Sequence, residues 1–152
     1  MNLRKKIEEK YKNAIFAKKS NEINTLRLIK SAIKDKDIDS RSEKKNEDIT
    51  DVEILSLLQS LIKQRKDSII SFKIASRDDL IAVEQNEIDI INQFLPQQLN
   101  EADTEAIIDK IINEYNFSTL KDMGMIMNNL KNSHTGSIDM ALAGKIARSK
   151  LS

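Results

Sequence analysis

The chain has 152 residues, of which 32% are charged and 39% hydrophobic, with three glycines, one proline and no cysteine. Few turn-forming residues and many aliphatic and charged ones are typical of helical proteins, so we expect an all-α fold with aliphatic cores. The lack of cysteine excludes a disulfide framework and a thiolate metal site, and a single histidine excludes a histidine-rich one.

Hydropathy and charge bear on location and partners. No apolar run approaches the roughly 20 residues that span a bilayer, and the opening MNLRKKIEEKYK is too charged for a signal peptide. We therefore expect a cytoplasmic protein with no membrane association.

The net charge is +7 over residues 1–45, −5 over 46–95 and −1 over 96–152. A basic arm beside an acidic middle predicts internal charge pairing or an anionic partner for the arm.

Two helices are predicted in the basic arm. The first covers residues 2–18 with Asn2 as its cap, and the second covers residues 22–36. Three basic residues of the second helix share one face: Arg27, Lys30 and Lys34. Residues 37–49, DIDSRSEKKNEDI, lack periodicity and are crowded with charge, which predicts a mobile loop.

The longest helical pattern runs from Thr50 to Ala75 without proline or glycine. Thr50 and Glu53 have the spacing of a capping box, in which each side chain bonds to the other residue's backbone N–H. Apolar residues then recur every three or four positions, and this seam is interrupted only by Arg65. A positive charge in an apolar seam requires a partner.

A fourth helix is predicted over residues 77–95, with Ser76 in the turn and as the N-cap. The third and fourth helices would form an αα-hairpin. Counting outward from Ser76 places Arg65 opposite Glu87, or opposite Glu84 one turn away. We expect a structural ion pair here, which fixes the register of the hairpin more than it adds stability.

Pro96 is the single proline of the chain and is expected to end the fourth helix. It divides the chain into an N-terminal four-helix domain, residues 1–96, and a small C-terminal three-helix domain, residues 97–152. In the C-terminal domain, the first helix is expected to be capped by Asn100 or Asp103 and to end near Tyr115. Two further helices follow, with these expected caps: Ser118 and Ser137.

Two glycines, Gly124 and Gly144, lie inside predicted helices, where each costs about 1 kcal/mol relative to alanine. Close helix packing is the predicted compensation, and close approach of a ligand backbone is the alternative. Signatures of catalysis are absent from the sequence: there is no glycine-rich phosphate loop, no nucleophile elbow and no metal-ligand cluster. We expect no catalytic residues, no metal site and no cofactor.

Five stretches together resemble the GatB/YqeY family, in the family's order and over essentially the whole chain. They are LRLIKSAIK (Leu26–Lys34), KQRKDSIISFKIASRDDL (Lys63–Leu80), FLPQQL (Phe94–Leu99), KDMGMIMNNLK (Lys121–Lys131) and the closing segment from Gly136. The resemblance implies an N-terminal helical domain followed by a smaller three-helix domain.

This family is similar to the C-terminal tail region of the B subunit of the glutamine-dependent tRNA amidotransferase, a carbon–nitrogen ligase with glutamine as amide donor. In that enzyme the tail helps to hold the tRNA, and the chemistry occurs on other domains that nothing in this chain matches. The resemblance therefore implies a non-catalytic, tRNA-associated module, with tRNA and amidotransferase subunits as candidate partners.

A helical RNA-binding module contacts phosphates through basic side chains. The candidate residues in the C-terminal domain are Lys121, Asn128, Lys131, Lys145, Arg148 and Lys150, and those in the arm are Arg27, Lys30 and Lys34. The near-neutral charge of residues 96–152 weakens this hypothesis. The alternative is a protein–protein adaptor that docks through an apolar groove of the C-terminal domain around Met123 and Met127. An enzyme in its own right is a third alternative.

Overall fold

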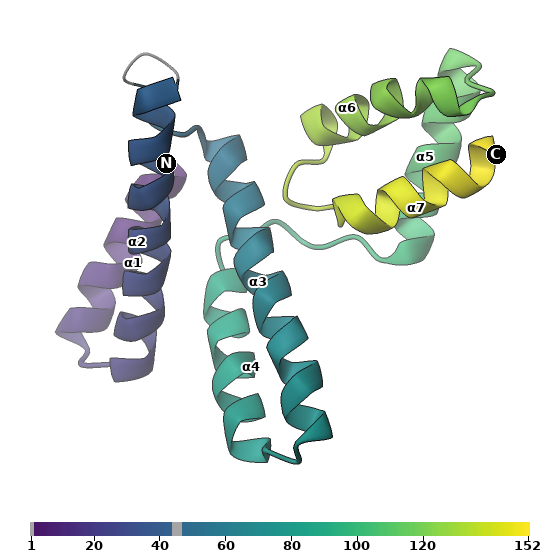
Figure 1. The fold of residues 1–152 in the computed structure, drawn as a ribbon. Coiled ribbons are helices and arrows are strands. Elements are labelled where there is room, and N and C mark those ends of the chain that lie inside the picture. The colour runs from purple at the N-terminus through teal and green to yellow at the C-terminus, as the bar shows by residue number, and fades with distance from the viewer. Residues whose placement is uncertain (1, 44–46) are drawn as a thin grey trace. The chain divides into compact units, whose positions relative to one another are not determined.

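A computed structural model describes residues 2–43 and 47–152 (Figure 1). The prediction of an all-α fold is confirmed, because these residues form seven α-helices and one short 3₁₀-helix, with no strand among them. The chain divides into two compact units, Met1–Leu95 and Pro96–Ser152. Autonomous folding of each unit, which the domain assignment 1–96 and 97–152 implies, stays a prediction.

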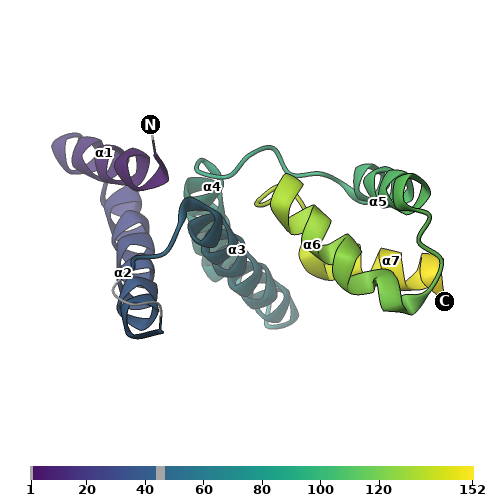
Figure 2. The same cartoon turned by 90° about the horizontal axis from the view of Figure 1, so that it is seen from above.

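The N-terminal unit contains four helices: α1 (Leu3–Phe16), α2 (Ser20–Glu43), α3 (Asp51–Ile74) and α4 (Asp78–Asn92). Helix α1 lies beside α2, and α3 and α4 form an antiparallel hairpin in both views (Figures 1 and 2). The core between them is aliphatic apart from Phe94, and several of its side chains are fully buried: Ile29, Ile54, Leu58 and Ile91. Burial of such a side chain contributes about 1.5–3 kcal/mol, so this core is the main stabilising element of the unit.

Helix α2 is longer than predicted. It continues to Glu43, so the expectation of a mobile loop over residues 37–49 is wrong for residues 37–43, and residues 44–46 of that expectation lie outside the described part of the chain. The buried residues of this last stretch are polar, Asp37 and Ser40, each 6% exposed. A hydrophobic periodicity cannot detect a helix whose inward side chains are polar.

Two of the predicted N-caps in this unit are confirmed and one is wrong. The side chain of Asn2 accepts a hydrogen bond from Lys5 N at 2.8 Å, and that of Thr50 accepts one from Glu53 N at 3.3 Å. Ser76 does not cap α4, which begins at Asp78 without a side-chain cap. Ser76 instead has a φ of 55°, the left-handed conformation that reverses the chain after α3.

The C-terminal unit contains α5 (Glu101–Tyr115), the 3₁₀-helix η1 (Leu120–Asp122), α6 (Met123–Ser133) and α7 (Met140–Leu151). Helix α7 packs on both α5 and α6. The centre of this core is formed by five residues with no exposed surface: Ile108, Ile126, Leu130, Ala143 and Ala147. Small alanines on α7 allow the three helices to approach closely.

Carboxylates take part in the caps of η1 and α7, and the caps predicted at Ser118 and Ser137 are wrong. Thr119 and Asp122 form a capping box around η1, and Asp122 Oδ2 also accepts from Ser118 N at 3.0 Å. Helix α7 is capped by Asp139, whose carboxylate accepts from Ala141 N at 3.0 Å and from Leu142 N at 3.2 Å. Asn100 caps α5, which confirms one of the two predicted alternatives.

The segment after Pro96 is fastened to the loop between α6 and α7. Leu99 N donates to Ser137 O at 2.8 Å, and the side-chain amide of Gln98 donates to Gly136 O. Gly136 is buried and has a φ of 80°, a conformation that glycine adopts without steric cost. The stretch FLPQQL and the closing glycine segment are therefore joined in space.

Candidate nucleic-acid interface

One exposed face of η1 and α6 brings together three of the candidate RNA-binding residues. Lys121, Asn128 and Lys131 are all exposed, and spacings of seven and three residues place them on the same side of the helix. We call the outward residues of this segment the α6 face: Leu120, Lys121, Gly124, Met125, Asn128, Lys131 and Asn132. The α6 face contains lysines, amides and apolar groups but no carboxylate.

Charge is polarised within the C-terminal unit, although its sum is close to zero. Residues 96–119 carry a net charge of −4, and residues 120–152 carry +3. The two carboxylates of the second segment, Asp122 and Asp139, bond to backbone amides at helix starts. The near-neutral total therefore conceals a cationic α6–α7 segment beside an acidic α5.

The two helical glycines differ in their surroundings. A β-carbon on Gly144 would lie 3.6 Å from Cε of Met127, an ordinary packing contact between α7 and α6. A β-carbon on Gly124 would have nothing within 4 Å, so the predicted compensation by helix packing is wrong for Gly124. Gly124 thus exposes the backbone of the first turn of α6 on the α6 face.

The three candidate residues of α7 do not act alike. Lys145 and Arg148 are exposed and three residues apart, and they lie on one side of the helix. Nζ of Lys150 instead lies 2.8 Å from Asp109 and 3.0 Å from Glu105, on α5. These two carboxylates raise the pKa of Lys150. Lys150 joins α7 to α5, so its charge is already neutralised inside the unit.

The candidate residues of α2 contact α1. Nζ of Lys30 lies 2.8 Å from Glu8 and 4.1 Å from the ring centre of Tyr11, and Nε of Arg27 donates to the Tyr11 hydroxyl at 3.2 Å. The Lys30 ammonium lowers the pKa of Glu8. Lys34 is exposed and has no ion pair among the described residues. Internal pairing thus accounts for part of the basic arm.

A groove of about 340 Å³ lies between α1 and α2. Its lining includes three cations, Arg4, Lys30 and Lys34, and two carboxylates, Glu8 and Asp37. Because Arg4 pairs with Asp37 and Lys30 with Glu8, the groove offers little net charge to an anionic ligand. It is a poor candidate for a phosphate site.

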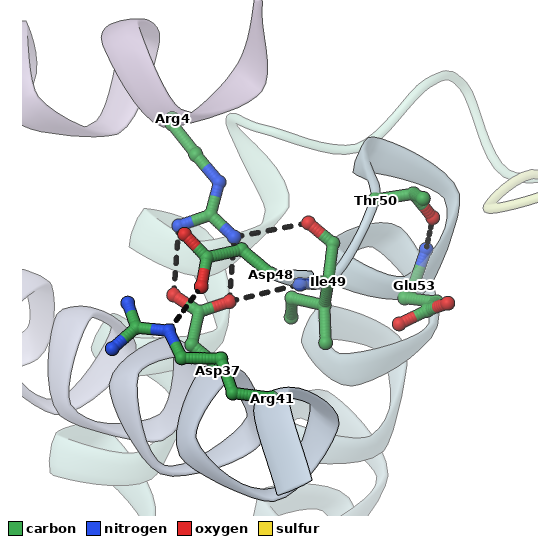
Figure 3. Close-up of polar contacts among 7 residues, drawn as sticks. All are labelled: Arg4, Asp37, Arg41, Asp48, Ile49, Thr50 and Glu53. Atoms are coloured by element: carbon green, nitrogen blue, oxygen red, sulfur yellow. Dashed lines mark hydrogen bonds and ion pairs between the residues drawn. The ribbon is translucent and has the colours of Figure 1, made fainter. Parts of the chain in front are cut away.

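Asp37 is the centre of a polar cluster that sequence reasoning missed (Figure 3). Its carboxylate accepts two hydrogen bonds from the Arg4 guanidinium, at 2.6 and 2.9 Å, and one from Ile49 N at 3.0 Å. Arg4 also donates to Ile49 O at 3.0 Å, and Arg41 donates to Asp48 at 2.6 Å. The cluster thereby joins α1, α2 and the residues that lead into α3.

The electrostatics of the cluster favour the ionised carboxylate. The Arg4 guanidinium lowers the pKa of Asp37, and the bond from Ile49 N acts in the same direction. Burial opposes this effect, since the Asp37 side chain is 8% exposed. A satisfied arginine–aspartate pair without a nearby nucleophile is a structural element, and we assign the cluster no catalytic role.

Arg65 and Glu87 are brought together by the α3–α4 hairpin. Nε of Arg65 lies 2.7 Å from Oε2 of Glu87, and its guanidinium also donates to Leu61 O at 2.9 Å. Their side chains are 12% and 23% exposed. Glu84, the other expected partner, makes no ion pair with Arg65 in the described structure.

The methionines proposed for an apolar docking groove lie partly inside the unit. Met123 and Met127 are half-buried and pack against the core around Ile126 and Leu130. The apolar side chains that face outward are Leu120 and Met125, which are 51% and 62% exposed. A helical wheel that begins at the 3₁₀ segment places both residues on the outward side. The helix was instead predicted to begin directly after Ser118.

The described part of the chain shows neither a metal-binding cluster nor a membrane-spanning helix. Within residues 2–43 and 47–152, no three histidine, cysteine or acidic side chains are grouped so that they could hold a metal ion. None of the helices described combines the length and apolar character needed to cross a membrane.

The seven helices and their division into two units define a small all-α protein with a cationic helix face. Residues 4–151 match the family model described as Yqey-like protein. The chain belongs to this family.

The chain is similar to several curated fungal proteins that carry the name Altered inheritance of mitochondria protein 41, mitochondrial. It is 35% identical over 110 residues to the one from Lachancea thermotolerans, covering 71% of this chain and 57% of that protein. It is 31% identical over 138 residues to the one from Clavispora lusitaniae, covering 91% and 72%. The match to the Saccharomyces cerevisiae protein is 38% identical over 86 residues, covering 57% and 44%.

These relatives bear on two earlier expectations. The chain spans 57% of the length of the Lachancea relative, so the function of that whole protein is not assigned to this chain. The prediction of a cytoplasmic location is wrong, because similar proteins are named as mitochondrial. A charged N-terminal helix is not a guide to compartment here, since α1 is a folded element that packs on α2.

Proposed function

We propose that the protein is a non-catalytic, tRNA-associated helical module, related in role to the tail region of the amidotransferase B subunit that its sequence resembles. The observation that carries this proposal is the α6 face, an exposed helix surface with two lysines, two amides and no carboxylate. The resemblance to the GatB/YqeY family includes this segment, residues 121–131.

The chemistry of the α6 face suits a phosphate backbone. Lys121 and Lys131 supply positive charge, and Asn128 supplies a neutral donor that can reach phosphate or ribose oxygens. Gly124 leaves the first turn of the helix uncovered, so that an RNA backbone can approach it. Double-helical RNA is recognised mainly through such backbone contacts, because its major groove is too narrow for side chains.

The first test compares two single charge reversals in the full chain. Lys131→Glu changes the α6 face, and Lys110→Glu makes the same change on an exposed position of α5. With a folded tRNA transcript, wild-type affinity should fall steeply with salt, and Lys131→Glu should reduce the slope of log affinity against log salt by about 1. Lys110→Glu should leave the slope unchanged. Absent binding, or equal effects of the two variants, contradicts the proposal.

Gly124→Ala separates binding from stability. Because the added methyl group meets open space in a helix, it should raise the free energy of unfolding by about 0.5–1 kcal/mol. On the α6 face it should also weaken tRNA binding by blocking the approach of the backbone. Chemical denaturation and fluorescence anisotropy on the same preparation measure both effects. Unchanged affinity in a stabilised variant would remove Gly124 from the interface.

A protein–protein adaptor is the second candidate, and the exposure of Leu120 and Met125 favours it. Two large apolar side chains on one helix face can anchor a partner, although they make a small patch. A pull-down with and without nuclease distinguishes the candidates. A partner retained after nuclease treatment and lost on Met125→Ser supports the adaptor, and loss of all partners with the RNA supports the tRNA-associated module.

A further inference from the structure

We propose that the outward face of α1 is a second RNA-contact surface, which holds phosphates with lysines and an unpaired base on Phe16. This inference rests on the proposed function and places the contact of the basic arm on α1, not on the candidates of α2, Arg27, Lys30 and Lys34. We call the following residues the α1 face: Lys5, Lys6, Lys10, Lys12, Phe16 and Lys18.

The fold leaves most of the positive charge of α1 without an ion-pair partner among the described residues. Residues 1–19 contain seven basic and two acidic residues. Arg4 pairs with Asp37 and Lys19 lies 3.9 Å from Glu22, while Glu8 pairs with Lys30 of α2. The five lysines of the α1 face are exposed and have no ion pair among the described residues, and the carboxylates nearest to them are Glu9 and, one turn before Lys12, Glu8.

An aromatic ring is exposed at the end of α1. Phe16 is 92% exposed, the largest exposed fraction of any large hydrophobic residue in the described structure. Lys12 and Phe16 are four residues apart and share a side of the helix, and Lys18 follows in the turn. A ring flanked by cations is the arrangement on which proteins stack unpaired bases.

The fold favours RNA over a lipid surface as the partner. The apolar side of α1, with Leu3, Ile7 and Ala14, is buried in the core of the unit. The helix therefore has no apolar face to place in a bilayer, as an interfacial helix requires. The exposed side of α1 carries cations over a length of about 20 Å, which suits contact with several phosphates of a nucleic-acid backbone.

A matched pair of triple variants tests the lysines in the full chain. Lys5→Gln, Lys12→Gln and Lys18→Gln together remove three charges from the α1 face. Lys63→Gln, Lys66→Gln and Lys73→Gln remove three exposed charges from α3. With a tRNA transcript, the α1 variant should lower the salt slope by about 2 and weaken binding at least about tenfold, whereas the α3 variant should change affinity less than about threefold. Equal losses in the two variants overturn the inference.

Phe16 has its own matched control in Ile74, which is 83% exposed at the end of α3. Phe16→Ala should weaken binding to a hairpin RNA with an unpaired loop by about fivefold or more, and should leave binding to a fully paired duplex unchanged. Ile74→Ala should change neither. An equal effect of Phe16→Ala on loop and duplex overturns base stacking.

The outcomes separate this inference from the proposed function. If Lys131→Glu weakens tRNA binding and the α1 variant behaves like the α3 variant, the α6 face stands and the α1 face is rejected. If only the α1 variant loses affinity, the α1 face stands and the α6 face is rejected. The last measurement is binding of the wild type and the α1 variant to vesicles made of equal amounts of phosphatidylcholine and phosphatidylserine. Vesicle binding that depends on the α1 lysines, without tRNA binding by the wild type, overturns both RNA proposals and assigns the α1 face to lipid.

Discussion

Asp37 accepts hydrogen bonds from two segments that are distant in sequence, α1 through Arg4 and the residue before Thr50 through its backbone amide. Each bond to an ionised group contributes about 1.5–3 kcal/mol, more than a bond between neutral groups. The cost of burying the carboxylate is offset only while both donors are present. Asp37 therefore ties α1 to α2 and to the residues that precede α3.

We expect Asp37→Asn to lower the free energy of unfolding by about 2–3 kcal/mol, because the amide group of asparagine faces the Arg4 guanidinium donor to donor. Asp39→Asn is the control, since Asp39 is exposed two positions later on α2. The folded pKa of Asp37 is lowered, so its stabilisation is complete above about pH 4 and is lost as the pH falls through the folded pKa. Denaturation of wild type and variant from pH 7 to pH 2 should show the difference shrink with acid. A constant difference would contradict this linkage.

At the scale of elements, the α3–α4 hairpin is organised by a short turn and one internal ion pair. Ser76 reverses the chain in a left-handed conformation, and Arg65 and Glu87 then face each other across the hairpin. The pair is mostly shielded from water, so loss of one partner leaves a poorly solvated charge. Its value lies in fixing the register of two helices whose remaining contacts are aliphatic.

A double-mutant cycle measures this coupling. Arg65→Met and Glu87→Gln should each destabilise the protein, and the two together should destabilise it less than the sum, with a coupling of about 1–2 kcal/mol. The same cycle with Glu84→Gln should show coupling near zero, because Glu84 does not pair with Arg65. Equal coupling to both glutamates would mean that the register differs from the one described.

Sequence patterns predicted the elements whose inward faces are apolar. The helix starts at Thr50 and Asn100 and the all-α class could be predicted because periodicity and capping chemistry agree there. The extension of α2 could not be predicted, because its inward residues Asp37 and Ser40 are polar, and the bonds from Arg4 that favour burial of Asp37 join segments far apart in the chain. The caps of η1 and α7 were missed because serine is as common an N-cap as threonine or aspartate, and Ser118 and Ser137 lie within two residues of the true caps, Thr119 and Asp139.

The candidate site was only partly accessible from sequence. The grouping of Lys121, Asn128 and Lys131 follows from helical spacing alone, and all three are exposed. The neutralisation of Lys30 by Glu8 and of Lys150 by Asp109 depends on contacts between helices far apart in the chain. No local rule predicts such contacts, and they decide which cations remain available to a partner.

At the scale of the whole molecule, the chain consists of two units with separate and unequal cores. Among the described residues, fourteen buried hydrophobic residues form the N-terminal core, and eight, two of them alanine, form the C-terminal core. A small unit buries a smaller fraction of its surface than a large one, so the C-terminal unit has the lower expected stability.

We expect residues 1–95 and residues 96–152, expressed separately, both to be helical, with the second melting at the lower temperature. Circular dichroism with thermal unfolding measures both. An unfolded C-terminal fragment would show that this unit requires the rest of the chain, which would contradict the assignment of two domains.

The Asp37 cluster also has a consequence for motion. A helix that ends near a chain terminus usually opens alone and exchanges its amide protons quickly. Arg4 is held to α2 and to Ile49, and Leu3 N also donates to Asp51 at the start of α3, at 3.3 Å. The first turn of α1 therefore cannot detach without also breaking the hydrogen bonds before α3. These three segments form one cooperative unit of local unfolding, so the lysines of the α1 face are displayed on a surface that is already ordered before any partner arrives.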